Sequence, residues 1–190
     1  RSTYKKLLCI AQRAFFEHYY NVKESSASTH ICSYSSDLRL KPEGVSNAAD
    51  AMAAIEKFVF EEEMVTLPQL VEILKNNWEG NQVLQMKMIN EGAKFGNGQK
   101  EAGNLACEMV NYFVERVEAY NSRYGDLIFS PCIATFSWIV NIGKRIGASA
   151  DGRMSKDPIA ANMSPVLSRD VSGPMAALNS YLKLSTDSLE

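Results

Sequence analysis

The sequence has no excess of basic residues and no long apolar run. Its 20 Lys and Arg stand against 22 Asp and Glu, which gives 190 residues a formal net charge of −2. This balance disfavours a nucleic-acid partner, because domains that bind nucleic acid carry a basic patch or stripe. No apolar stretch approaches the roughly 20 residues of a membrane-spanning helix, so we expect no membrane partner.

Cysteine and histidine are also scarce, and none of them forms a closely spaced pair. They are Cys9, Cys32, Cys107 and Cys132, with His18 and His30. Zinc sites use closely spaced ligands, so we predict no metal site. There is no secretory signal segment, which favours four reduced thiols in a reducing compartment over two disulfides in a secreted domain.

Apolar residues recur at spacings of three and four in several segments, as in amphipathic helices. Thr66, with Pro68 after it, is typical of a helix start, and Asn47 is a plausible N-cap. Gly80 and Gly92 are expected helix ends. Helices are therefore predicted over residues 4–20, 48–63, 67–78, 82–91, 101–120 and 174–182.

Residues 127–143 differ from the helical segments. They are β-branched, aromatic and nearly uncharged, which predicts a strand buried on both faces. A turn-rich stretch follows at 147–153 and a loop at 158–173, whereas a Ser-rich loop is expected at 23–38. The order of elements predicts an α/β or α+β fold, with a helix-rich first part followed by a buried strand, a turn and a loop region.

Five groups of residues occur in order between Gly44 and Leu184. They are 44–55 (GVSNAADAMAAI), 65–80 (VTLPQLVEILKNNWEG), 94–97 (KFGN), 143–153 (GKRIGASADGR), and a closing group of 162–165 (NMSP), 169–170 (RD) and 173–180 (GPMAALNS). Together they resemble the C-terminal half of the pyruvate formate-lyase family of glycyl radical enzymes. Ala150 departs from the Pro usual before Asp-Gly-Arg, and Met175 departs from the usual Thr.

The resemblance implies an α/β fold that is a fragment of a ten-stranded barrel. Residues 44–190 would be part of this barrel domain, truncated at both ends, and residues 1–43, which match poorly, would form a helix and a Ser-rich loop. Arg1 in place of an initiating Met agrees with a cut chain.

The resemblance also implies a radical mechanism. Family members store a radical on a backbone glycine and pass it to a cysteine, whose thiyl radical abstracts hydrogen from the substrate. Neither Cys9 nor Cys32 resembles the family's cysteine motif, and no Arg-Val-x-Gly-Tyr-like string is present. We therefore assign no catalytic residue and expect this chain alone to be inactive.

The strand before the Asp-Gly-Arg turn lines the substrate barrel in the family. Thr135, Phe136 and Ser137, with Ala134 beside them, are therefore candidates for one wall of a substrate pocket, and core packing is an equally weighted alternative. Trp138 is expected in the core or facing the same cavity.

Three further residues have a structural interpretation that we prefer. Cys132 is expected to be a packed thiol rather than a reactive one. Asp151 and Arg153 are expected to hold a turn by a charge-assisted hydrogen bond rather than to clamp a ligand.

The hypothesis from sequence is a fragment of a cytoplasmic glycyl radical enzyme, a lyase or acyltransferase similar to formate C-acetyltransferase. The parent would act on a small polar metabolite in anaerobic metabolism. By resemblance it would be a homodimer, and a radical S-adenosylmethionine activase would install its radical, with no cofactor bound in these residues. The bulky candidate wall favours a substrate other than pyruvate. The alternative is a non-catalytic remnant or structural companion protein.

Overall fold

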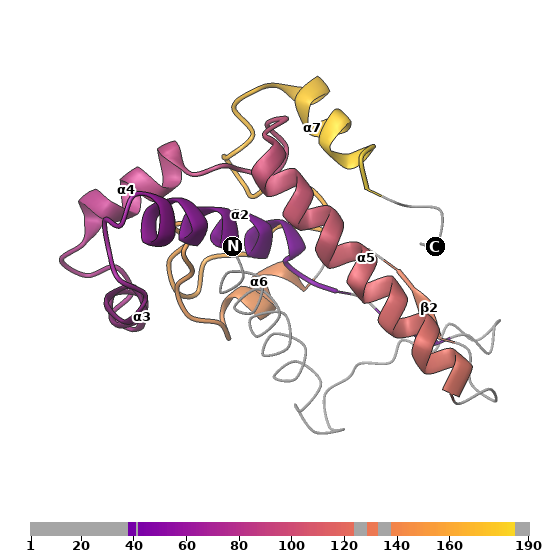
Figure 1. Ribbon diagram of the computed structural model, residues 1–190. Coiled ribbons are helices and arrows are strands. Elements are labelled where there is room, and N and C mark those ends of the chain that lie inside the picture. The colour runs from indigo at the N-terminus through magenta and orange to yellow at the C-terminus, as the bar shows by residue number, and fades with distance from the viewer. Residues whose placement is uncertain (1–37, 41, 124–128, 133–137, 185–190) are drawn as a thin grey trace.

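The computed structural model describes residues 38–40, 42–123, 129–132 and 138–184 (Figure 1). The expectations for residues 1–37, including the first helix and the Ser-rich loop, lie outside this range. In chain order the elements are β1 (Leu38–Leu40), α2 (Val45–Ile55), the π-helix η1 (Glu56–Glu61), α3 (Leu67–Lys75), α4 (Gln82–Glu91), α5 (Lys100–Arg123), β2 (Phe129–Pro131), α6 (Ile139–Gly143) and α7 (Pro174–Tyr181).

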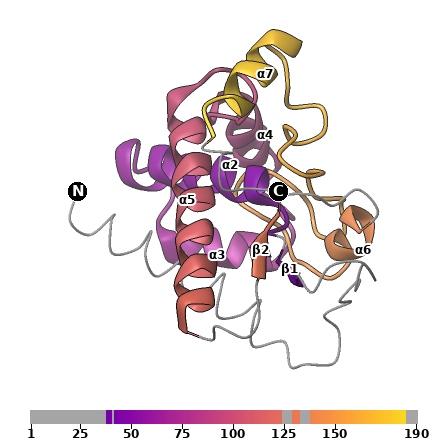
Figure 2. The same ribbon diagram turned by 90° about the vertical axis from the view of Figure 1, so that its right-hand side faces the viewer.

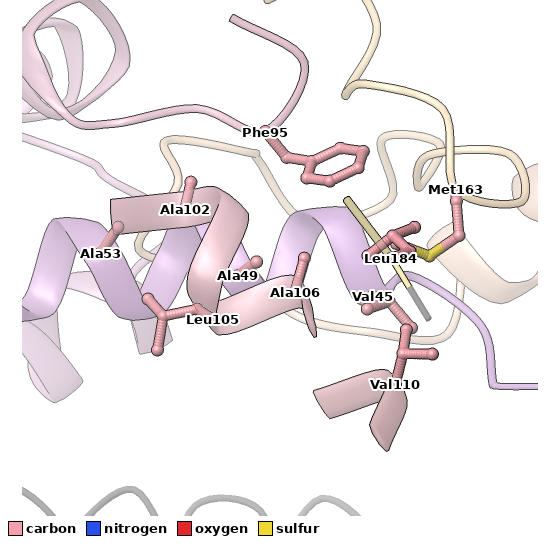
Figure 3. Packing of buried hydrophobic residues seen from close by; sticks show 10 residues of the cluster. All are labelled: Val45, Ala49, Ala53, Phe95, Ala102, Leu105, Ala106, Val110, Met163 and Leu184. Carbon is pink, nitrogen blue, oxygen red and sulfur yellow. The ribbon is translucent and has the colours of Figure 1, made fainter. Parts of the chain in front are cut away.

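The main packing contact joins α2 and α5, which lie side by side in Figures 1 and 2. Alanines face the contact from both helices at four-residue spacing: Ala49 and Ala53 on α2, and Ala102 and Ala106 on α5. Small side chains at this spacing let two helix axes approach closely. Figure 3 shows the same cluster, in which Phe95 lies near the α2–α5 contact.

A second cluster connects the end of α2 and η1 with α3 and α4. Phe58, Leu70, Trp78 and Met88 are fully or almost fully buried in it, and Ala150 of the later turn region joins them. Trp78 therefore has the core position that its size predicts. This cluster places the 147–153 turn against helices that end more than 50 residues earlier in the chain.

The sheet consists of two strands in the described part of the chain. β1 and β2 are parallel, with Leu38 opposite Phe129 and Leu40 opposite Pro131. Asn121, near the end of α5, fixes the start of β2, because its side chain accepts from Phe129 N at 2.8 Å and donates to Phe129 O at 2.7 Å. Among the described residues, no helix is both long and apolar enough to cross a membrane.

Most helices predicted between residues 48 and 182 are confirmed within a few residues. One correction concerns Asn47, which is not an N-cap. The helix begins earlier, with Gly44 as its N-cap at φ 72°, and Asn47 is buried within α2. Its side chain binds residues far along the chain instead of the first-turn amides.

A second correction concerns the predicted strand over 127–143. Of the described residues in this segment, 129–132 and 138–143, only Phe129–Pro131 are extended and paired with β1, and the last five, Ile139–Gly143, form α6. Tertiary contacts accompany this helical end. A Cβ on Gly143 would lie 2.2 Å from Asp157 O, so the close approach of the 157–158 backbone requires glycine at the end of α6. Ile159 N also donates to Ile139 O at 3.3 Å, which ties the following loop to this helix.

Candidate functional site

The candidate pocket wall, Thr135, Phe136 and Ser137 with Ala134, lies outside the described residues. The structure describes the segments on both sides of it. Cys132, directly after β2, is 5% exposed and is therefore a packed thiol, as predicted. Trp138, before α6, is 39% exposed, so the expectation that it is a core residue is wrong.

The Asp-Gly-Arg turn is built around the buried Arg153 side chain. Its Nη1 donates to Met154 O at 3.0 Å and to Asp157 O at 2.9 Å, its Nη2 donates to Gly147 O, and its Nε donates to Ser149 Oγ at 3.3 Å. Five N–H donors in a fixed fork suit a guanidinium to such convergent carbonyls. The prediction of a turn held by charge-assisted hydrogen bonds is confirmed, and these acceptors are mainly backbone carbonyls.

Asp151 holds the other side of this turn and connects it with α2. Its Oδ1 accepts from Ser149 Oγ at 2.5 Å and from Arg153 N at 3.3 Å. Its Oδ2 accepts from Asn47 Nδ2 at 2.7 Å, while Asn47 Oδ1 accepts from Ala160 N, also at 2.7 Å. One amide side chain thus joins α2 to the turn and to the loop that follows it.

Gly152 between these two residues has φ 90°, in the left-handed region that disfavours other residues. A Cβ there would lie 2.2 Å from Ile89 Cγ1 of α4. Gln85 Nε2 of the same helix donates to Gly152 O at 2.9 Å, and Trp78 Nε1 donates to Arg153 O at 3.3 Å. The turn is therefore in close contact with α4 and α3–α4 loop residues as well as with α2.

A buried ionisable pair, Asp50 and Lys94, lies beside this network. Asp50 Oδ1 accepts from Phe95 N at 2.6 Å, but its Oδ2 has no hydrogen-bond partner among the described residues. Burial raises the pKa of Asp50 well above its ordinary value, and the Phe95 amide and the Lys94 charge only partly oppose this shift. Desolvation likewise lowers the pKa of Lys94, whose Nζ donates to Met88 O at 2.8 Å and Gly92 O at 3.1 Å.

An open cavity of about 360 Å³ adjoins Lys94 between the end of α4 and the loop before α7. Asn97 holds this loop, because its Nδ2 donates to Arg169 O at 2.7 Å and its Oδ1 accepts from Ser172 N at 3.0 Å. The lining residues are Ile89, Asn90, Gly92, Lys94, Asn97, Gln99, Ser168, Arg169, Val171 and Ser172.

The sequence analysis considered Asn47 only as an N-cap and Lys94 only as part of the 94–97 group, and it did not single out Asp50, although all three are buried and polar. Asn47 and Asp50 are one helical turn apart on the face of α2 that also carries Ala54. Polar residues at core spacing in an otherwise apolar face are a signal of a buried network. Across the described ranges, no group of three or more His, Cys, Asp or Glu side chains could hold a metal ion.

Comparison with known proteins identifies the relatives of the chain. A family model described as "Pyruvate formate lyase-like" matches residues 29–143. The isethionate sulfite-lyase of Oleidesulfovibrio alaskensis is 31% identical over 140 residues, which is 72% of this chain and 16% of that protein. The (2S)-3-sulfopropanediol dehydratase of Klebsiella oxytoca is 30% identical over 146 residues, 74% of this chain and 18% of that protein.

Solved structures give the same result for the fold. The glycerol-bound B12-independent glycerol dehydratase from Clostridium butyricum superposes with a TM-score of 0.70 at 36% identity, covering 77% of this chain and 19% of that one. A glycyl radical enzyme from Archaeoglobus fulgidus, at 24% identity, has the same fold over 80% of this chain with a TM-score of 0.72. The chain thus spans less than a fifth of the length of these relatives.

Proposed function

Because the chain belongs to the pyruvate formate lyase-like family of glycyl radical enzymes, we propose that it is a segment of a glycyl radical lyase that eliminates a group from a small polar metabolite. The proposal rests on the names of the relatives that are at least 30% identical to this chain. They include two isethionate sulfite-lyases and two dehydratases. Loss of water or sulfite favours elimination over the acyl transfer of a formate C-acetyltransferase.

The part of this chain in the reaction is to build and hold one wall of the substrate pocket. In the sequence, residues 133–137 follow β2 after Cys132, and ligand sites in parallel sheets lie beyond the carboxyl ends of the strands, which supports this proposal. Thr135 and Ser137 each offer a hydroxyl group that donates to and accepts from a polar substrate, and Phe136 offers an apolar surface that excludes water. These three residues remain our candidates for substrate contact.

The radical itself requires groups outside these residues. We propose that a radical S-adenosylmethionine activase installs it on the parent enzyme and that the parent is a cytoplasmic homodimer of anaerobic metabolism. The residues of this chain take no part in radical storage in this proposal. They orient and enclose the substrate.

The proposal is tested first by reading the coding DNA on both sides of this sequence. A cysteine motif upstream and an Arg-x-x-Gly-Tyr-like string downstream are expected. The complete protein, activated anaerobically with its activase, should then give the electron paramagnetic resonance signal of a glycyl radical and release water or sulfite from a small diol or sulfonate. A complete reading frame without either motif would contradict the proposal and favour a non-catalytic companion protein.

The pocket wall is tested in the same activated enzyme. Replacing Thr135 or Ser137 with Ala should raise KM about 10-fold or more, as expected for loss of a hydrogen bond to bound substrate. Ser122→Ala is a matched control, because Ser122 is exposed on α5 and its hydroxyl donates only to Glu118 O within the described residues. Equal KM values for all three variants would remove Thr135 and Ser137 from the pocket.

A further inference from the structure

We propose that the cavity between α4 and the loop before α7 binds a small oxyanion, such as a phosphate, sulfate or carboxylate group, between Lys94 and Arg169. The cavity is a concave space of about 360 Å³, large enough for such a group with its water. Among the described residues that line it, Lys94 and Arg169 are cationic and none is Asp or Glu. The lining residues therefore favour an anion over a cation.

Arg169 carries a guanidinium group that makes no hydrogen bond within the described residues, although its charge acts on Asp50. Within the described residues its backbone is bonded, to Asn97 through the carbonyl and to Val166 through the amide, but no hydrogen bond or ion pair ends on its side chain. A guanidinium group carries five N–H donors in a fork that matches an oxyanion. The Asn97 side chain holds the backbone of this loop, because it binds Arg169 O and, three residues later, Ser172 N.

Lys94 supplies the second charge from deeper in the wall. Two of its three N–H donors bind Met88 O and Gly92 O, at the C-terminal end of α4, and one remains. The Arg169 charge lies near enough to lower the pKa of Lys94, although burial is the larger cause. An anion between the two cations would relieve this repulsion and accept from both.

Two acidic groups lie near the cavity without lining it. The charges of Asp50 and Asp151 both act on Lys94, and the charge of Arg169 acts on Asp50, whose pKa is raised by burial, which favours its neutral form. Asp151 is bound to Ser149 and Asn47 and does not line the cavity. With Asp50 neutral, an anion in the cavity would balance the charges of Lys94 and Arg169.

The experiment is isothermal titration calorimetry, in which inorganic phosphate is titrated into the 190-residue chain at constant ionic strength and the heat of binding is measured. Sulfate and acetate are titrated in parallel. We expect saturable binding of at least one anion and a matching rise in the unfolding temperature, since a ligand that binds the folded state stabilises it. Arg169→Gln should weaken binding by about 10- to 100-fold, as expected for loss of hydrogen bonds from a charged group.

Arg145→Gln is the control, because Arg145 is exposed after α6, does not line the cavity, and changes the net charge equally. It should bind as the unchanged chain does. The relative affinities for phosphate, sulfate and acetate identify which oxyanion the cavity prefers. Heats that never saturate for any of the three, or equal affinity in both arginine variants, would overturn the proposal, and neither result bears on the proposed lyase function.

Discussion

Asn47 and Asp151 are 104 positions apart in the chain, yet Asn47 Nδ2 donates to Asp151 Oδ2 at 2.7 Å in the buried interior. The same side chain accepts from Ala160 N, so it bridges α2, the Asp-Gly-Arg turn and the loop after it. This bridge ties together two of the five groups of residues on which the family resemblance rests, 44–55 and 143–153, and joins them to the loop at Ala160. The resemblance therefore follows, in part, from residues that a single buried network requires.

Replacing Asn47 with Ala should lower the free energy of unfolding by about 2–4 kcal/mol, because it leaves the Asp151 carboxylate and the Ala160 amide without a partner in a buried site. Urea unfolding followed by circular dichroism measures the change. Asn179→Ala is a suitable control, because Asn179 is exposed on α7. It should change the stability by less than about 0.5 kcal/mol. Similar losses in both variants would show that the bridge contributes nothing specific.

The buried carboxyl group of Asp50 should give the stability of the chain a distinct pH dependence. Its pKa in the folded chain is well above the ordinary value of 3.8, mainly because burial disfavours the charged form. Between these two pKa values the folded chain keeps a proton that the unfolded chain has released. Stability contributed by Asp50 is therefore complete below pH 3.8 and is lost as pH rises through the folded pKa.

Comparison with Asp50→Asn isolates this effect, because the amide retains an acceptor for Phe95 N and cannot ionise. The difference in unfolding free energy between the two proteins should change steadily from pH 4 to pH 7. The unchanged chain should become less stable relative to Asp50→Asn as pH rises. Lys94, Asp151 and Arg169 are the charged groups that act on Asp50, and all three are present in both proteins. Parallel curves would mean that Asp50 is ionised in the folded chain.

Local sequence patterns predicted the helices best where a helix carries its own signals. Thr66 and Gln69 form a capping box at the start of α3, with both reciprocal bonds present, and Pro68 lies in the first turn. The predicted bounds of α4 match the structure at both ends. Such signals act within a few residues and need no knowledge of the rest of the fold.

The predictions failed where distant residues decide the structure. Asn47 is a good N-cap by residue type, but its partners are more than 100 positions away and draw it into the interior of α2. The apolar run over 127–143 has the composition of one strand, but its last five residues form α6. Gly143, at the end of this helix, lies close to the backbone of residues 157–158, a contact that the local sequence does not indicate. The cavity beside Lys94 and Arg169 joins segments about 75 positions apart, and no motif spacing indicates it.

The Thr66 cap gives a prediction about one helix end. Thr66→Ala removes the acceptor for Gln69 N and one half of the capping box, so the free energy of unfolding should fall by about 1 kcal/mol. Thr66→Ser keeps the hydroxyl group and should restore most of that loss. Hydrogen exchange of the amides in the first turn of α3 should be faster in the Ala variant alone. Equal exchange in all three proteins would contradict a capping role.

Gly152 offers a test that separates backbone strain from steric contact. Gly152→Ala should destabilise the chain by about 2–4 kcal/mol, because it adds strain at φ 90° to a clash with Ile89 Cγ1. Gly98→Ala measures strain alone, since Gly98 has φ 71° and no atom within 4 Å of an added Cβ. It should lower the stability by about 1 kcal/mol.

Shortening the Ile89 side chain, which an added Cβ on Gly152 would meet, completes this test. Ile89→Ala on its own should be destabilising through lost packing against the turn. If the clash is the larger part of the Gly152→Ala effect, the double variant should be more stable than the sum of the two single losses predicts, by about 1–2 kcal/mol. If the two single losses simply add in the double variant, the destabilisation by Gly152→Ala comes from backbone strain alone. Glycine would then be required at position 152 by its left-handed backbone and not by the space that Ile89 occupies.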